Sequence, residues 1–156
     1  MLQKTIRKTS RAEPVRITII ASAYNAEYVD GMINAALGVL AQSGVKDVEL
    51  IRVPGAFEIP VIAAKIARRK RNRPRAVLNL GVIFRGKTSH ADHIGNSITQ
   101  SLAGIATETG VPMVHEVLLL DNKSQAKARC LSKTMNRGTE AAHTALAMAK
   151  LIQQIP

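Results

Sequence analysis

Hydrophobic and polar positions alternate along this chain with two different periods. Short apolar runs rich in β-branched residues are typical of strands buried on both faces, and apolar positions that recur every three or four residues predict amphipathic helices. The first pattern predicts four strands, at residues 15–22, 48–53, 76–84 and 111–120. The second pattern predicts five helices, at residues 26–42, 59–71, 92–109, 122–131 and 139–153.

The order of these elements predicts the fold class. Strands that alternate with helices are joined by right-handed crossovers, which produce a parallel sheet covered by helices on both faces. We therefore expect an α/β fold of three layers, with a mostly parallel four-stranded sheet in the middle. The sequence has no internal repeat and no low-complexity linker, so we expect a single domain over residues 14–156. We expect residues 1–13, a basic tail, to be mobile or held by another chain.

Composition excludes several classes of protein. With 46% hydrophobic residues in 156, the chain can bury a sizeable core. No apolar run approaches the ~18 residues that a membrane span requires, and the N-terminal residues lack the apolar centre of a secretory signal. The one cysteine, Cys130, excludes an internal disulfide. We expect a cytoplasmic protein without a membrane partner.

The charge is strongly basic, with 22 Lys and Arg against 11 Asp and Glu. Residues 65–75 alone carry seven positive charges and no acid, and residues 4–16 carry five more against Glu13. Such a run attracts nucleic acid, but cations also favour the last turn of a helix, where residues 68–71 are predicted to lie. Because no RNA-binding motif, zinc finger or interleaved aromatic residue accompanies the run, we do not expect nucleic acid as a partner.

Three of the four aromatic residues directly follow predicted strands. Tyr24 follows the first strand, Phe57 the second, and Phe84 ends the third. In open parallel sheets, ligands bind beyond the carboxyl ends of the strands. Large rings usually belong to the core, and we expect this of Phe84. For Tyr24 and Phe57, which lie beside turns, a core position and a surface for a flat ligand are equally good interpretations.

The segment VPGAFEIP, residues 53–60, lies at the same expected edge. Pro54 and Gly55 predict a turn, and Gly55 permits a close approach of the backbone to a ligand. Glu58 falls at the start of a predicted helix, where its charge would interact favourably with the helix dipole. The same carboxylate could instead accept hydrogen bonds from a polar ligand beside Phe57, and the segment alone does not separate the two.

The segment FRGKTSHADH, residues 84–93, combines a turn with a helix start. Ser89 is a candidate N-cap with Asp92 three residues later, which predicts a loose capping box. The unpaired N–H groups of such a helix start form an anion site, to which Lys87 and Thr88 would add a charge and a hydroxyl. His90 would lie in the first turn, in a position suited to general acid–base chemistry near neutral pH. His90 and His93 are too few ligands for a metal, and we expect none.

The last polar cluster, residues 121–138, carries Arg129, Lys133 and Arg137 at intervals of four. Arginine binds phosphate through two parallel charge-assisted hydrogen bonds. A solvated helix face explains the same spacing, and the pattern by itself favours that simpler explanation.

Five segments, taken together and in this order, resemble the lumazine synthase family. They are AYN (23–25), VPGAFEIP (53–60), LGVIFRGKTSHADH (80–93), LLLDNKSQAKAR (118–129) and NRGTEAAHTALAMAKL (136–151). The resemblance implies a flavodoxin-like domain and a reaction without a cofactor. In that reaction 5-amino-6-ribitylaminouracil and 3,4-dihydroxy-2-butanone 4-phosphate condense to 6,7-dimethyl-8-ribityllumazine, with release of phosphate and water.

The resemblance also implies roles for particular residues. His90 matches the family's acid–base histidine. Positions matching substrate-binding residues are Tyr24, Asn25, Ala56, Phe57, Glu58, Val82, Ile83 and His115. Positions matching the phosphate site are Gly86, Lys87, Thr88 and Arg129, with Lys133 and Arg137 as further basic positions near it.

Four residues depart from the family pattern. His115 stands where a phenylalanine usually reaches into a neighbouring subunit's site, and Glu116 replaces a small residue beside it. Lys87 replaces a small or acidic residue, and Ala91 replaces an aromatic one. The altered wall at residues 115–116 leaves a second interpretation, a shell that binds flavin or lumazine with weak activity.

Assembly is a further implication of the resemblance. Family members are pentamers whose sites lie between adjacent chains, and some build decamers or icosahedral shells. We therefore expect a homo-oligomer, in which the N-terminal segment could be added to a neighbouring subunit's sheet. The short segment between Arg129 and Asn136 favours the shell, within which riboflavin synthase is a candidate partner.

Overall fold

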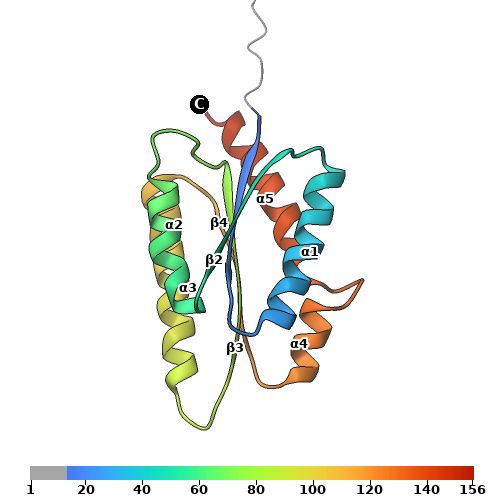
Figure 1. Cartoon of the computed structure of the whole chain (residues 1–156). Coiled ribbons are helices and arrows are strands. Elements are labelled where there is room, and N and C mark those ends of the chain that lie inside the picture. The colour runs from blue at the N-terminus through green and yellow to red at the C-terminus, as the bar shows by residue number, and fades with distance from the viewer. Residues whose placement is uncertain (1–13) are drawn as a thin grey trace, which may run out of the picture.

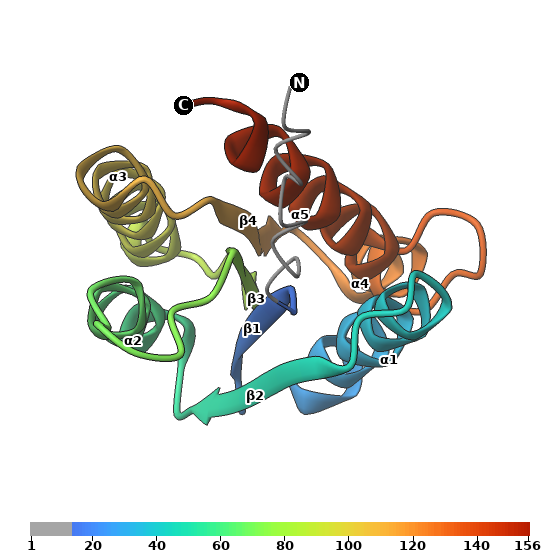
Figure 2. The same cartoon turned by 90° about the horizontal axis from the view of Figure 1, so that it is seen from above.

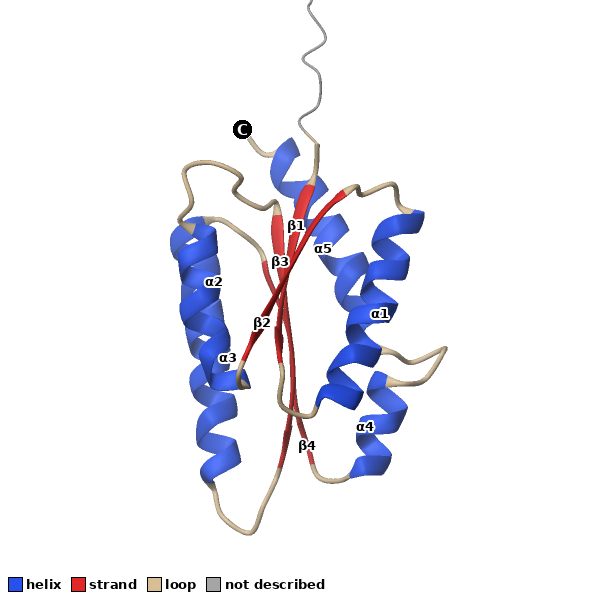
Figure 3. Cartoon of the chain, viewed as in Figure 1, coloured by secondary structure: helices blue, strands red, loops and turns tan. Residues whose placement is uncertain are grey.

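The computed structural model describes residues 14–156, and the expectations for the tail at residues 1–13 lie outside this range. Its sheet consists of β1 (Arg16–Ser22), β2 (Asp47–Val53), β3 (Ala76–Phe84) and β4 (Met113–Leu120). The strands lie in the order β2-β1-β3-β4, and each neighbouring pair is parallel. Figure 3 shows the sheet between two layers of helices. The predicted three-layer α/β fold of flavodoxin type is confirmed, with the four described strands all parallel.

The helices divide between the two faces of the sheet (Figures 1 and 2). One face is covered by α1 (Ala26–Gln42), α4 (Lys123–Cys130) and α5 (Arg137–Gln154), and the other by α2 (Ile59–Ala67) and α3 (His90–Thr109). A short 3₁₀ turn, η1 (Ala56–Glu58), precedes α2 and was not predicted. Among the described residues, no helix is long and apolar enough to cross a membrane.

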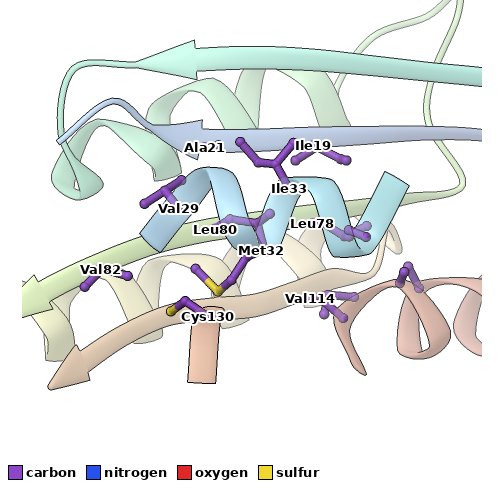
Figure 4. Close-up of a cluster of buried hydrophobic side chains, with 14 of the residues drawn as sticks. Ile19, Ala21, Val29, Met32, Ile33, Leu78, Leu80, Val82, Val114 and Cys130 are labelled. Carbon is purple, nitrogen blue, oxygen red and sulfur yellow. The ribbon is translucent and has the colours of Figure 1, made fainter. Parts of the chain in front are cut away.

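Each face of the sheet buries its own hydrophobic cluster. Ile19, Leu78 and Leu80 of the sheet pack beside Val29 and Met32 of α1 (Figure 4). On the opposite face, Ile20 and Val77 belong to a cluster with residues of α2 and α3, among them Ile59, Ile98 and Leu102. Alternate residues of one strand thus serve two cores, which explains why the strands are continuous apolar runs.

The helix predicted at residues 59–71 ends earlier, at Ala67, so this prediction was wrong in its last turn. Arg73 Nε donates to Ala67 O at 2.7 Å and supplies a partner for a carbonyl at the end of α2. Arg69 turns toward the sheet, where its guanidinium bonds both oxygens of Glu49 at 2.7 and 3.1 Å. The cations of residues 68–71 therefore lie in a loop, not in a helix.

Two other elements begin a few residues away from their predicted starts. β4 begins at Met113, not at residue 111, and Pro112 before it has no N–H to donate to a sheet. The helix predicted at residues 139–153 begins at Arg137, because Asn136 accepts a hydrogen bond from Gly138 N at 2.8 Å and acts as the N-cap.

Candidate functional site

The structure has a hollow of about 370 Å³ at the carboxyl ends of the strands, called here the carboxyl-edge hollow. Seven residues predicted to bind substrate line it: Tyr24, Asn25, Ala56, Phe57, Glu58, Val82 and Ile83. Gly55, Phe84 and Ile94 complete the lining and had no predicted role in binding. Segments more than fifty residues apart in the sequence thus meet at the edge where parallel sheets bind ligands.

The turn after β1 holds Tyr24 at the mouth of this hollow. Asn25 has a left-handed backbone (φ 57°), which asparagine tolerates better than most residues, and it starts α1. Its Nδ2 donates to Val82 O at 2.8 Å and fastens the turn to β3. Tyr24 itself remains 74% exposed. The structure therefore excludes a core position for Tyr24 in this chain.

The four aromatic rings separate into two kinds. Tyr28 and Phe84 pack edge to face, with ring centroids 5.8 Å apart. Phe84 is half-buried against the core cluster and also lines the hollow, so its predicted core position holds only in part. Phe57 is 58% exposed, like Tyr24, and both rings line the hollow. A flat ligand is the kind of molecule that two exposed rings at a hollow can accommodate.

Glu58 provides the negative group of the hollow. It precedes α2, but its side chain makes no capping hydrogen bond, and its carboxylate has no ion-pair or hydrogen-bond partner among residues 14–156. A Cβ at Gly55 would lie only 2.8 Å from Glu58 Oε2, so glycine lets the carboxylate fold over the turn. The carboxylate oxygens thus remain available to hydrogen-bond donors of a ligand.

The loop after β3 leads from the hollow to His90. Residues 86–90 are exposed, and His90 is the first residue of α3. The predicted capping box at Ser89 and Asp92 was wrong, because Ser89 makes no side-chain cap and lies 3.3 Å from His93 Nε2 instead. Asp92 is drawn away by the guanidinium of Arg85, whose Nε is 3.1 Å from Asp92 Oδ1.

Arg85 is a residue of this site that received no role from sequence. Its Nη1 donates to Asp121 Oδ1 at 2.7 Å, in addition to the bond from Nε to Asp92, and its backbone N donates to Leu120 O at 2.9 Å. The same guanidinium lowers the pKa of Asp121. Arg85 therefore joins the ends of β3 and β4 to the first turn of α3. The sequence signal that could have identified Arg85 is an arginine directly at a strand end, with acidic residues in two later segments.

The basic residues expected near a phosphate lie apart from the hollow. Arg129 is exposed on α4, which covers the sheet face opposite α2 and α3 (Figure 2). Lys133 is exposed in the loop after α4. Neither residue lines the carboxyl-edge hollow of its own chain.

Arg137 is paired with two carboxylates. Its Nε and Nη2 each donate to a Glu116 oxygen at 3.0 Å, and its Nη1 bonds Glu140. Glu116 is 6% exposed, and burial raises the pKa of this carboxyl despite the opposing effect of Arg137. The carboxylate of this pair is buried, whereas 39% of the Arg137 side chain is exposed, so water screens the attraction more than it relieves the burial of Glu116.

His115 faces α3 from β4 and also lies outside the hollow of its own chain. Thr99 Oγ1 donates to Gly95 O at 2.9 Å, so the 2.8 Å contact between this hydroxyl and His115 Nε2 requires the proton on Nε2. His115 Nδ1 accepts from Val117 N at 3.2 Å, in agreement with that tautomer. Burial lowers the pKa of His115 and favours the neutral ring. The structure therefore holds this imidazole in one orientation and one tautomer.

A parallel α/β sandwich with a small, ring-lined hollow at its carboxyl edge is the architecture of a protein that binds a small, flat, polar molecule. The family model described as 6,7-dimethyl-8-ribityllumazine synthase matches residues 14–153. A 6,7-dimethyl-8-ribityllumazine synthase from Kineococcus radiotolerans is 41% identical over 85% of this chain and 81% of its own length. One from Nitratidesulfovibrio vulgaris is 35% identical over 97% of both chains. The chain belongs to the 6,7-dimethyl-8-ribityllumazine synthase family, and the protein is an enzyme of riboflavin biosynthesis.

Proposed function

We propose that the protein condenses 5-amino-6-ribitylaminouracil with 3,4-dihydroxy-2-butanone 4-phosphate to give 6,7-dimethyl-8-ribityllumazine, phosphate and water. The observation that carries this proposal is the carboxyl-edge hollow, in which two exposed rings and an unpaired carboxylate adjoin the loop to His90. The rings suit a pyrimidine, and the Glu58 carboxylate suits the hydroxyl donors of a ribityl chain.

The chemistry requires proton transfer at several steps. The amine of the pyrimidine attacks the ketone, and the resulting hydroxyl leaves as water to form an imine. Phosphate is then eliminated with loss of a proton from carbon, which leaves an enol that becomes a second ketone. The ribityl-bearing nitrogen attacks this ketone, and a second water leaves as the ring closes. His90, exposed at the start of α3, is positioned to move these protons. The departing phosphate requires cations and N–H donors, for which the first turn of α3, Lys87 and Arg129 are the candidates.

Each site is proposed to lie between two chains of a homo-oligomer. Arg129 of α4 does not line the hollow of its own chain, so we infer that the Arg129 that serves a given hollow comes from a neighbour. His115 on β4, at an edge of the described sheet, is proposed to approach a neighbour's hollow in the same way. Much of the catalysis then consists in holding two substrates together, which is an entropic effect.

Lumazine fluorescence after mixing the protein with both substrates tests the reaction directly. His90→Ala is expected to slow turnover by about 10- to 1,000-fold with the fold retained. Arg129→Ala is expected to raise the KM for the butanone phosphate. No rate above the uncatalysed background would overturn the proposed reaction, and unchanged kinetics in Arg129→Ala would remove that residue from the site.

Subunit complementation tests the shared site. His90→Ala and Arg129→Ala chains, each alone, leave every site defective. If the two residues of one site come from different chains, random co-assembly in equal amounts restores about a quarter of the sites, because the intact halves then meet by chance. If both residues of a site come from one chain, co-assembly restores none.

A second candidate function is a shell that binds flavin or lumazine with weak activity, favoured by the fixed His115 and the buried Glu116 at the proposed subunit wall. Tight riboflavin binding without turnover would support it over the enzyme. Enclosure of riboflavin synthase and a cytoplasmic location remain proposals, which co-sedimentation and cell fractionation would test.

A further inference from the structure

The end of the molecule opposite the carboxyl-edge hollow carries a second, strongly basic depression. A hollow of about 700 Å³ lies where β1 and β3 begin, and another of about 620 Å³ lies beside the ends of α2 and α3. Both are lined by Lys70 and Arg73, so the two hollows adjoin across the loop of residues 68–75. We call this continuous depression the basic furrow. In Figure 1 it corresponds to the upper end, where the described chain starts and the C-terminus lies.

The furrow concentrates positive charge. Arg16 and six Lys or Arg residues of the 68–75 loop line it, against the carboxylates of Asp47 and Glu108. Asp47 is already paired with Arg16, and Glu108 with Arg68, each at 2.9 Å. Arg69 is paired with Glu49. The charges of Lys70, Arg71 and Arg73 have no carboxylate partner within residues 14–156.

Arg73 holds the centre of the furrow in place. Its Nε donates to Ala67 O, the last carbonyl of α2, and its Nη2 donates to Thr109 O at the end of α3. These carbonyl bonds satisfy donors without neutralising the charge, and they keep a cation between the two hollows. Lys70 and Arg71, which are exposed and make no side-chain hydrogen bond within the described residues, stand beside it.

Among the described residues, the furrow has no aromatic ring on which a base could stack. The chain has only four aromatic residues, and three line the carboxyl-edge hollow while the fourth, Tyr28, packs on Phe84. Sequence-independent binding of nucleic acids normally combines a basic groove with aromatic rings on which bases stack. A basic groove without rings is suited to a ligand that offers phosphates alone. Pro14, where the described chain begins, lines the furrow.

We propose that the basic furrow binds a chain of phosphates without bases, of which inorganic polyphosphate is the simplest. The ligand lies across the 68–75 loop and bridges the two hollows, with Arg73 at the centre and Lys70 and Arg71 beside it. Binding is electrostatic and weakens as salt is added, because each neutralised phosphate releases a counterion. This site is separate from the proposed substrate site and leaves catalysis unchanged.

A binding measurement with fluorescently labelled polyphosphate tests the proposed site. The full-length protein is used in its native assembly, and fluorescence anisotropy is recorded over a series of salt concentrations. The variant pair Lys70→Ala/Arg71→Ala removes two charges that hold no other part of the described fold. The matched control, Lys123→Ala/Lys127→Ala, removes two charges from α4 at the other end of the molecule. The furrow pair is expected to weaken binding at least about 10-fold and to make the salt dependence shallower by about one to two counterions.

The control pair is expected to change polyphosphate affinity by less than about 2-fold, since long-range effects of exposed charges are screened. Equal losses of polyphosphate affinity in the two variant pairs would overturn the furrow as the binding site. Unchanged affinity in Lys70→Ala/Arg71→Ala would also overturn it and would point to the N-terminal residues instead. Tighter binding of a single-stranded oligoribonucleotide with the same number of phosphates would overturn the assignment to a base-free ligand. Lumazine formation by Lys70→Ala/Arg71→Ala should equal that of the parent protein.

Discussion

At the scale of single residues, Arg85 shows how a side chain without a catalytic atom can determine a site. Its guanidinium contacts Asp92 in the first turn of α3 and Asp121 after β4. The loop of residues 86–89, which is proposed to bind phosphate, is thereby held at its beginning and close to its end. His90 lies two residues before Asp92, so the position of the imidazole depends on this bridge.

Arg85→Met removes both contacts and is expected to lower kcat/KM for lumazine formation by about 10- to 100-fold, since small displacements of reacting groups are costly. The thermal midpoint should change little, because ion pairs exposed to water contribute little to stability. Kinetics and thermal unfolding of the same preparation check this. Arg85→Lys is the control and should be intermediate, because lysine keeps the charge but lacks the planar fork. Full activity in Arg85→Met would show that the loop is held by other contacts.

At the scale of elements, β4 is joined to α5 by the buried Glu116 and its half-exposed partner Arg137. The raised pKa of Glu116 means that the folded protein favours the uncharged carboxyl. For a carboxyl whose pKa is raised on folding, the contribution to stability is fully present below the ordinary value of 4.5 and is lost as the pH rises through the raised pKa.

Glu116→Gln, which resembles the uncharged carboxyl, is therefore expected to be as stable as the parent at neutral pH, or more stable. Urea unfolding at several values between about pH 4 and pH 8 should show the difference between variant and parent growing as pH rises. Arg137→Met is the contrast and should be destabilised at neutral pH by a few kcal/mol, because it leaves a buried carboxylate unpaired. A Glu116→Gln protein that is much less stable than the parent at pH 7 would contradict the assigned direction.

The crossing of α1 and α5 is a second contact between elements that depends on one position. A Cβ at Gly138 would overlap the carbonyl of Met32, which belongs to the backbone of α1 and cannot move aside like a flexible side chain. Gly138→Ala is therefore expected to destabilise the fold by about 1–3 kcal/mol through overpacking. Gly104→Ala, in α3 with open space around the added methyl group, is the control and should be neutral or slightly stabilising. Denaturant midpoints of the two variants measure the difference, and equal midpoints would show that α1 and α5 can separate without cost.

At the scale of the whole molecule, the chain presents surfaces that favour assembly. The sheet of the described residues ends in β2 on one side and β4 on the other, and unpaired strand edges are readily covered by another chain. Leu50 of β2 is an exposed apolar residue, and so are Val61 of α2 and Leu131 and Met135 in the loop after α4. We therefore expect sedimentation velocity at micromolar protein to show a pentamer or a larger multiple, with little of the 16.8 kDa monomer. A fully active monomer would contradict both the assembly and the shared site.

The sequence predicted the elements well and some of their ends poorly. The centres of the strands were predictable because a buried parallel strand requires an apolar run, which is a local property. The end of α2 at Ala67 was not, because the loop that follows is held by Arg73 and by the pair of Arg69 with Glu49, twenty residues away. The predicted capping box was wrong for the same reason, a contact with a residue of another segment, since Asp92 is held by Arg85.

The sequence by itself determined the α/β class, the family, and the edge of the sheet at which Tyr24, Phe57 and Glu58 would gather. The class and the edge follow from periodicity and from strand ends, which neighbouring residues in the chain define, and the family follows from the resemblance of five segments. Only the tertiary structure decided that Tyr24 and Phe57 are exposed, that Arg137 is paired with Glu116, and that Arg129 lies on α4 outside the hollow. These properties depend on which distant segments the packed core brings together, and such distances are not encoded in any local pattern.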